Sequence, residues 1–221
     1  TLWMSMRFFG EGLSCVRGER LVFDGLDFAV SPGAALVLTG RNGSGKTSLL
    51  RVMAGLTRSA AGRIGWDDGL ITDEPERHRA RIAYAGHLDA IKPVLSVGEN
   101  AIGWACLHGG DERTATQALE AFDLADLADM PARYLSAGQR HRLALARLPA
   151  GGATLWLMDE PTVALDSESV GALNRAISRH RENGGMAVIA TNVALEIPGA
   201  TTLKMTPANM TAAKNTLDSE S

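Results

Sequence analysis

The sequence predicts an α/β protein with a largely parallel sheet, and three observations support this. Short apolar runs alternate with helix-forming segments along most of the 221 residues, as in sheets whose strands are connected by helices. The segment 40–47 (GRNGSGKT) fits the pattern GxxxxGKS/T of a phosphate-binding loop and lies between a predicted strand and a predicted helix. From about residue 88 to 135, helical signals replace strand signals, which predicts a small helical subdomain inserted into the α/β body.

The first elements are predicted to be antiparallel strands. Three short apolar runs at 13–16, 21–23 and 26–30 are separated by Gly18 and Gly25, and the last of them alternates apolar with polar residues. The elements predicted next are a buried strand at 33–40, a helix from Lys46 that Gly55 ends, a turn-rich stretch from Gly62 to Pro75 and a buried strand at 82–86.

The second half begins with helices. Ser96 and Glu99 form the sequence pattern of a capping box, and the segment from Asp111 to Leu124 places Ala118, Leu119 and Phe122 on one helix face. The elements that follow are a helix at 138–148, a buried strand at 153–158, a helix at 167–183, a strand at 186–191 and a last strand at 201–205. We expect one domain over residues 1–206 and a disordered tail over residues 207–221, which are polar and rich in small residues.

Composition and charge exclude several classes of protein. With 22 Lys and Arg against 25 Asp and Glu, the net charge is -3, which argues against a protein that holds a nucleic acid backbone by charge. The two cysteines, Cys15 and Cys106, make no zinc-type or CxxC pattern, and we expect both to be buried, reduced thiols. No run approaches 18 apolar residues and the first residues do not resemble a signal peptide, so we expect any membrane role to be peripheral.

The glycine-rich segment predicts a site for a nucleoside triphosphate and Mg²⁺. Its glycines let the backbone turn N–H groups toward an anion, and the following helix adds its positive N-terminal end. Lys46 is expected to reach the β and γ phosphates, and Thr47 to ligate Mg²⁺. The predicted binding residues of this loop are Gly40, Arg41, Asn42, Gly43, Ser44, Gly45, Lys46, Thr47 and Ser48.

A second motif, ATLWLMDEP, supplies two carboxylates. Its apolar strand delivers Asp159 and Glu160 to the carboxyl end, where α/β sheets place their ligands. We expect Asp159 to hold Mg²⁺ through water and Glu160 to polarise the attacking water as a general base.

A third motif, LSAGQ at 135–139, resembles the LSGGQ signature of the ABC-type ATPases, with Ala137 in place of one glycine. The resemblance implies an ATPase with a RecA-like P-loop core, an antiparallel β subdomain and a helical subdomain. It also implies a homodimer that encloses ATP. In such a dimer Ser136, Gly138 and Gln139 of one subunit face the γ-phosphate held by the other, and Asp166 lies at the same seam as the D-loop aspartate.

Further segments are similar to one branch of that family, the ATP-binding subunits of the haem exporters used in cytochrome c maturation. They are LSCVRGERLVFDGLDF, NGSGKTSLLRVMAGL, YAGHLDAIKPVLSVGEN and LWLMDEPTVALD, and the likeness spans about residues 13–192. The resemblance implies an integral membrane partner like CcmB with CcmC and CcmD, an indirect link to a haem chaperone, and a peripheral place on the cytoplasmic face of the bacterial inner membrane.

Three positions depart from the general ABC pattern. His87 replaces a glutamine, as is usual in the haem-exporter branch, and would lie near Mg²⁺ and the attacking water. Arg17 replaces the aromatic residue that stacks on adenine and could stack its guanidinium plane there. Asn192 replaces a catalytic histidine, and its amide can donate a hydrogen bond but cannot act as a cation or base, so we expect slow turnover.

Several functions remain open at this point. A soluble ABC ATPase that acts on nucleic acid or ribosomes is disfavoured, because the chain has one ATPase unit and no basic stripe. Asn192 leaves open a nucleotide switch that hardly hydrolyses ATP. A transporter of another cargo is also open, because the motifs contact only ATP and no CxxCH haem motif is present.

Overall fold

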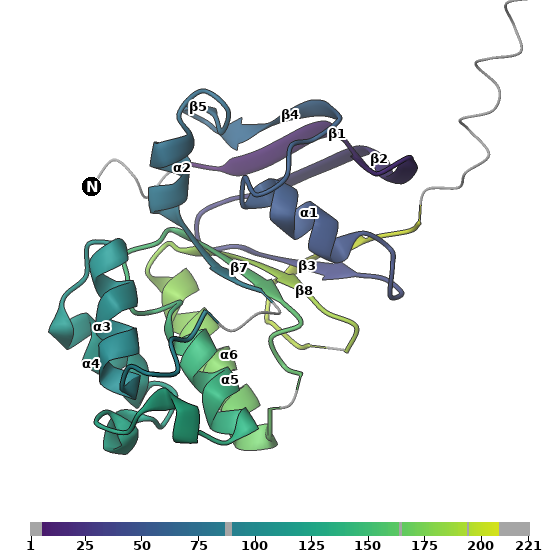
Figure 1. The fold of residues 1–221 in the computed structure, drawn as a ribbon. Coiled ribbons are helices and arrows are strands. Elements are labelled where there is room, and N and C mark those ends of the chain that lie inside the picture. The colour runs from purple at the N-terminus through teal and green to yellow at the C-terminus, as the bar shows by residue number, and fades with distance from the viewer. Residues whose placement is uncertain (1–5, 87–89, 164, 194, 208–221) are drawn as a thin grey trace, which may run out of the picture.

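Two sheets organise the chain in the computed structural model, which describes residues 6–86, 90–163, 165–193 and 195–207 (Figure 1). The first is antiparallel with the order β2-β1-β4-β5, and the second is parallel with the order β6-β7-β8-β3-β9. The strands are β1 (Phe8–Arg17), β2 (Arg20–Val30), β3 (Ala35–Thr39), β4 (Ala61–Trp66), β5 (Gly69–Leu70), β6 (Ile82–Ala85), β7 (Leu155–Asp159), β8 (Met186–Ala190) and β9 (Thr201–Lys204).

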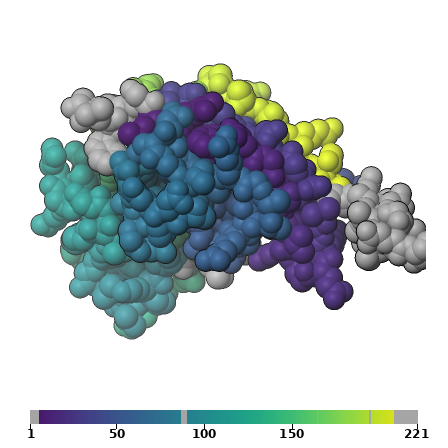
Figure 2. All heavy atoms as spheres, turned by 90° about the horizontal axis from the view of Figure 1, so that it is seen from above, coloured from purple at the N-terminus to yellow at the C-terminus, as the bar shows by residue number. Residues whose placement is uncertain are grey.

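The helices cover the parallel sheet on both faces. In Figure 1, α1 lies between the two sheets, and α3, α4, α5 and α6 lie on the opposite side of the parallel sheet. The helices are α1 (Lys46–Met53), α2 (Pro75–Arg81), α3 (Val97–Leu107), α4 (Glu112–Glu120), α5 (Ala137–Ala146) and α6 (Ser167–Glu182), with 3-10 turns η2 (Ala125–Leu127) and η3 (Ala132–Tyr134). Seen from above, the surface is formed mainly by the N-terminal half of the chain (Figure 2).

No helix in the described ranges has both the length and the apolar character that crossing a bilayer requires.

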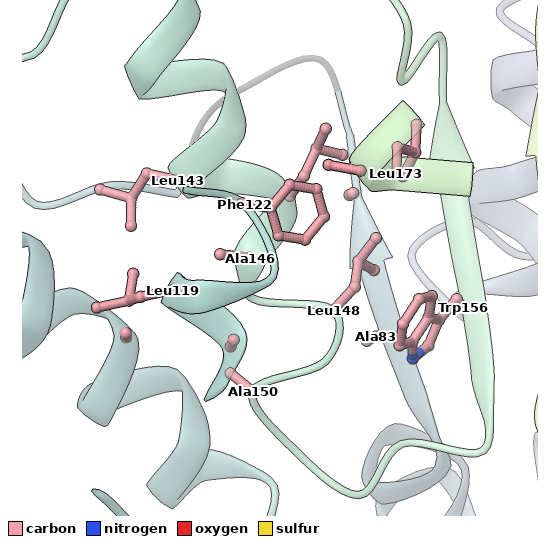
Figure 3. Close-up of a cluster of buried hydrophobic side chains, with 14 of the residues drawn as sticks. Ala83, Leu119, Phe122, Leu143, Ala146, Leu148, Ala150, Trp156 and Leu173 are labelled. Carbon is pink, nitrogen blue, oxygen red and sulfur yellow. The ribbon is translucent and has the colours of Figure 1, made fainter. Parts of the chain in front are cut away.

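Alternating side chains divide the interior into two cores. Leu155 and Leu157 of β7 point into the core shared with α1 and the antiparallel sheet. Trp156 and Met158 point into the core shared with α3 to α6, part of which is drawn in Figure 3. Because successive side chains of a strand face opposite sides of a sheet, a continuous apolar run such as LWLM indicates a strand that is buried on both faces.

The α/β class, the parallel sheet and the helical character of the described residues between 90 and 135 are confirmed. The predicted capping box at Ser96 and the predicted helix from Asp111 are also present, although α4 ends at Glu120 and does not continue to Leu124. The last predicted strand is β9. Cys15 is buried as expected, but the prediction was wrong for Cys106, which is exposed in the last turn of α3. The domain limits of 1–206 stay a prediction, and the predicted tail lies outside the described residues from residue 208 on.

The prediction of antiparallel strands at the start is confirmed, but their division into three short strands was wrong. β1 already begins at Phe8, and the runs at 21–23 and 26–30 belong to one strand, β2. Gly25 does not interrupt that strand, because it adopts a φ of 59° where the pairing of β1 with β2 shifts in register. A glycine with positive φ inside a strand is typical of a β-bulge.

The prediction of a turn-rich stretch was also wrong for its first residues, which form β4 and lead into β5. The glycines there allow strands to approach closely instead of making turns. A Cβ on Gly62 would lie 2.3 Å from the carbonyl oxygen of Gly12, and one on Gly65 would lie 2.6 Å from that of Gly69. Glycine in a strand can mark close backbone approach, and the sequence alone does not separate this from a turn.

Candidate active site

The phosphate-binding loop connects β3 to α1 and depends on glycine at its bends. Gly40, Gly43 and Gly45 have φ angles of 148°, 80° and 100°. A Cβ on Gly40 would lie 2.4 Å from the carbonyl oxygen of Met205, so a side chain does not fit there. The N-terminus of α1 has no side-chain cap and no acidic residue in its first turn. Its first N–H groups and its dipole are therefore available to an anion.

Lys46 lies at the start of α1 with only 6% of its side chain exposed. Its Nζ atom donates to the carbonyl oxygen of Gly40 at 2.8 Å and to Oδ1 of Asn192 at 2.5 Å. The Oε1 atom of Glu160 lies 3.8 Å away. A buried ammonium group needs such partners, and all three of them stand beside the phosphate-binding loop.

Thr47 and Asp159 bring two oxygen donors together. The Thr47 hydroxyl donates to Oδ1 of Asp159 at 3.1 Å, which joins α1 to the end of β7. Hydroxyl and carboxylate oxygens are the donors that Mg²⁺ prefers, and Mg²⁺ usually takes its remaining ligands from water and substrate phosphates. The described residues contain no group of three or more His, Cys, Asp or Glu that could hold a metal by themselves. The pair therefore fits a Mg²⁺ ion that arrives with a phosphate ligand.

Glu160 follows β7 in a backbone conformation that is uncommon for a side-chain-bearing residue. Its φ is 50°, and its N–H donates to the carbonyl oxygen of Ala190 at 2.8 Å. Its Oε2 atom accepts from the backbone N–H of Asn192 at 3.1 Å. Positive φ at a non-glycine residue costs free energy and is found preferentially at functional sites. The hydrogen bonds with Ala190, at the end of β8, and with Asn192 therefore fix the orientation of the Glu160 carboxylate.

These groups line a cavity of about 610 Å³, a size typical of small-molecule sites. Its lining residues are Arg17, Arg20, Leu21, Val22, Asn42, Gly43, Ser44, Gly45, Lys46, Thr47, Ser48, Glu160, Asn192 and Pro207. Gly40 and Arg41 line a neighbouring cavity of about 640 Å³ with Asn42 and Asn192. The structure therefore brings the predicted loop, Arg17, Glu160 and Asn192 together, and Asp159 joins them through Thr47.

The sequence analysis missed the contribution of β2 to this cavity. Arg20, Leu21 and Val22 line it because the β1–β2 hairpin pairs Arg17 with Arg20. A hairpin prediction at Gly18 would have placed these residues beside Arg17. His87 lies outside the described residues.

The signature residues are not part of this cavity. Ser136 caps α5, where its hydroxyl accepts from the N–H of Gln139 at 3.2 Å and Gln139 Oε1 accepts from the N–H of Ser136 at 2.9 Å. A Cβ on Gly138 would meet no atom within 4 Å. Asp166 caps α6, and hydrogen bonds from Ser169 hold the pKa of its carboxyl below the ordinary value. None of these four described residues lines the cavity of its own chain.

The fold and the site agree with known proteins. The ABC transporter family model matches residues 23–163. The cytochrome c biogenesis ATP-binding export protein CcmA of Rhodospirillum rubrum is 54% identical over 198 residues, which cover 90% of this chain and 85% of that protein. The CcmA protein of Paramagnetospirillum magneticum is 50% identical over 202 residues, covering 90% and 93%.

A solved structure of an ATP-binding subunit of an ABC transporter superposes with a TM-score of 0.78 at 23% identity, covering 84% of this chain and 79% of that one. This similarity establishes the fold. The family model and the relatives of 50% identity and more show that the chain belongs to the ABC transporter ATP-binding proteins and, among them, to the cytochrome c biogenesis export branch.

Proposed function

We propose that the chain binds ATP with Mg²⁺ and hydrolyses it as the ATPase subunit of an ABC export complex that serves cytochrome c biogenesis. The main support is the convergence of three distant segments on one cavity. The loop with Lys46 and Thr47, the strand end with Asp159 and Glu160, and Asn192 after β8 all meet there. The likeness to CcmA proteins supports the biological role.

The loop and Lys46 would bind the phosphates through N–H groups and an ammonium group. Arg17, in the wall formed by the β1–β2 hairpin, would lie against the adenine ring. Thr47 and Asp159 would hold Mg²⁺, which supplies positive charge to the β and γ phosphates when it is bound. These residues position the substrate and balance its charge.

Glu160 would orient and polarise the water that attacks the terminal phosphate. Among the described residues its carboxylate is the one acidic group in the cavity lining, and one of its oxygens accepts a hydrogen bond from the backbone N–H of Asn192. Asn192 and His87 would act beside it, as expected from their places in the sequence.

A second copy of the chain would complete the site. Ser136, Gly138, Gln139 and Asp166 lie outside the cavity of their own chain, and the N-terminus of α5 offers positive potential to an anion. In a homodimer these residues would face the ATP bound to the partner. Closing with ATP and opening after hydrolysis would then drive a membrane partner through its different affinity for the two states.

The partner that we propose is an integral membrane protein resembling CcmB, together with CcmC and CcmD, with haem chaperone release as the outcome. The chain would bind it peripherally at the cytoplasmic face of the bacterial inner membrane. A tagged chain carrying Glu160→Gln, purified with ATP from detergent-solubilised membranes, should recover one small multi-span protein and a haem-absorbing component. Recovery of an unrelated permease without haem would refute the cytochrome c role and retain the ATPase.

Hydrolysis itself is tested by phosphate release from the assembled complex. Glu160→Gln should lower the rate by about 10²- to 10⁴-fold, the usual contribution of a positioned general base, while ATP binding persists. Glu112→Gln, the same change at the start of α4, is the matched control and should leave the rate unchanged. Equal rates in the Glu160 variant and the wild type would contradict the assignment of the base.

A switch that binds ATP but hardly hydrolyses it is the second candidate. Asn192 favours it, because its amide stands in the place of the expected histidine and can donate a hydrogen bond but cannot act as a cation or base. ATP binding without phosphate release above that of the Glu160→Gln variant would support the switch.

A further inference from the structure

Asn192 joins three groups of the site through three different atoms. Its Oδ1 accepts from Lys46 Nζ at 2.5 Å, its Nδ2 donates to Oδ1 of Asn42, and its backbone N–H donates to Oε2 of Glu160 at 3.1 Å. The orientation of the amide follows from chemistry, because a lysine ammonium group only donates hydrogen bonds and must face the amide oxygen. The side chain therefore acts toward Lys46 as an acceptor.

This contact limits what Lys46 can offer to a nucleotide. An ammonium group has three N–H donors, and Gly40 and Asn192 take two of them, whereas Oε1 of Glu160 at 3.8 Å lies beyond hydrogen-bond distance. One donor remains, which is enough for a diphosphate. Contact with both the β and the γ phosphate requires a second donor, so one of the two protein oxygens has to leave Lys46.

The oxygen of Asn192 is the one that can leave. The Gly40 carbonyl belongs to a backbone bend that Met205 packs against, as the 2.4 Å approach to a Cβ there shows. Asn192 is exposed, and a side-chain rotation is enough to move its oxygen from Lys46 into water. We propose that Asn192 sets the preference of this site between ATP and ADP, because its amide oxygen competes with the third phosphate for Lys46. This inference rests on the proposed nucleotide site.

The competition for Lys46 affects the two nucleotides differently. It weakens the binding of ATP and leaves the binding of ADP unaffected, so removing the amide oxygen of Asn192 should favour ATP. For one partly exposed hydrogen bond to a charged group we expect about a tenfold change in the ratio of the two dissociation constants. A carboxylate at this position would hold Lys46 more strongly and repel the third phosphate, so it should change the ratio in the opposite direction.

The experiment measures Kd for ATP and for ADP by calorimetry on the full chain, with EDTA present so that ATP is not consumed. Asn192→Ala should raise Kd(ADP)/Kd(ATP) about tenfold, and Asn192→Asp should lower it by at least about as much. Val193→Ala, a truncation of the exposed neighbouring side chain, is the matched control and should keep the wild-type ratio.

An unchanged or lowered ratio in Asn192→Ala would overturn the inference, since a lowered ratio means that the amide donates to the third phosphate. Such a result would leave the nucleotide site itself intact. If the wild-type chain bound neither ATP nor ADP, this result would refute the proposed function, and the inference with it. If Asn192→Ala does not fold, a ratio in Asn192→Asp that stays at or above the wild-type value would still overturn the inference.

Discussion

His78 connects helix α2 to the helix that follows the phosphate-binding loop, and its titration should make the fold sensitive to acid. Its Nδ1 accepts from Trp66 Nε1 at 3.1 Å, and its Nε2 lies 2.9 Å from the carbonyl oxygen of Met53, the last residue of α1. The ring is neutral in this arrangement, with the proton on Nε2. Burial lowers its pKa from 6.5 to about 4, and the charges of Arg81 and Arg79 contribute in the same direction.

The direction of the pH effect on stability follows from the pH at which the unfolded and the folded chain each bind the proton. The unfolded chain takes it up near pH 6.5, and the folded chain only near pH 4. Stability from the neutral ring is therefore complete above pH 6.5 and is lost as the pH falls toward 4. The full difference is worth about 3 kcal/mol, and about 2 kcal/mol of it is lost between pH 7 and pH 5.

Urea unfolding followed by circular dichroism at pH 7 and pH 5 measures this loss. His78→Gln keeps a side chain that can accept from Trp66 and donate to Met53 but does not titrate. The wild type should therefore lose about 2 kcal/mol more than the variant between the two pH values. Burial also lowers the pKa of His180 to about 4, but that residue titrates in both proteins and cancels in the comparison. Equal losses would refute the reasoning.

Three further predictions concern the site. Gly40→Ala should lower the free energy of unfolding in urea by at least about 2 kcal/mol, because Gly40 has a φ of 148° and an added methyl group would contact Met205. Gly43→Ala, with open space around the added methyl group, should lower it by about 1 kcal/mol. Equal losses in the two variants would contradict the geometry. Asp159→Asn should raise the Mg²⁺ concentration for half-maximal hydrolysis by about tenfold or more, and an unchanged titration midpoint would show that Asp159 does not hold the ion. Asn192→His should hydrolyse ATP faster than the wild type in the assembled complex, by up to about a hundredfold, and equal or lower rates would show that Asn192 is not limiting.

The parts of the fold that the sequence predicts are those where one local pattern has one structural meaning. The run LWLM is apolar at every position, and both faces of β7 are buried against separate cores. Ser96 and Glu99 indicate a helix start because their side chains satisfy each other's backbone. The glycines of β4 have no such single meaning. Gly62 is read as a turn residue until β1, which is distant in sequence, is known to approach it, and Gly65 until β5, just beyond the next turn, is known to pair with β4.

In the candidate site, too, local motifs are visible in the sequence and contacts between distant segments are not. The loop from Gly40 to Thr47 and the pair Asp159 and Glu160 are contiguous motifs, so their chemistry is visible in the sequence. The role of Arg20 in the cavity wall is not visible, since it depends on the hairpin that places it opposite Arg17. The contact of Asn192 with Lys46 depends on two segments 146 positions apart.

That contact changes how a faster Asn192→His enzyme has to be interpreted. Histidine would add a donor near the terminal phosphate, but it would also remove the amide oxygen that holds Lys46. Asn192→Ala separates the two effects, because it releases Lys46 without adding a donor. If phosphate release rises in Asn192→Ala together with the preference for ATP, release of Lys46 is sufficient to explain the gain. If phosphate release rises only in Asn192→His, the wild-type site is slow because it lacks the histidine donor, and the nucleotide preference is a separate property of the same residue.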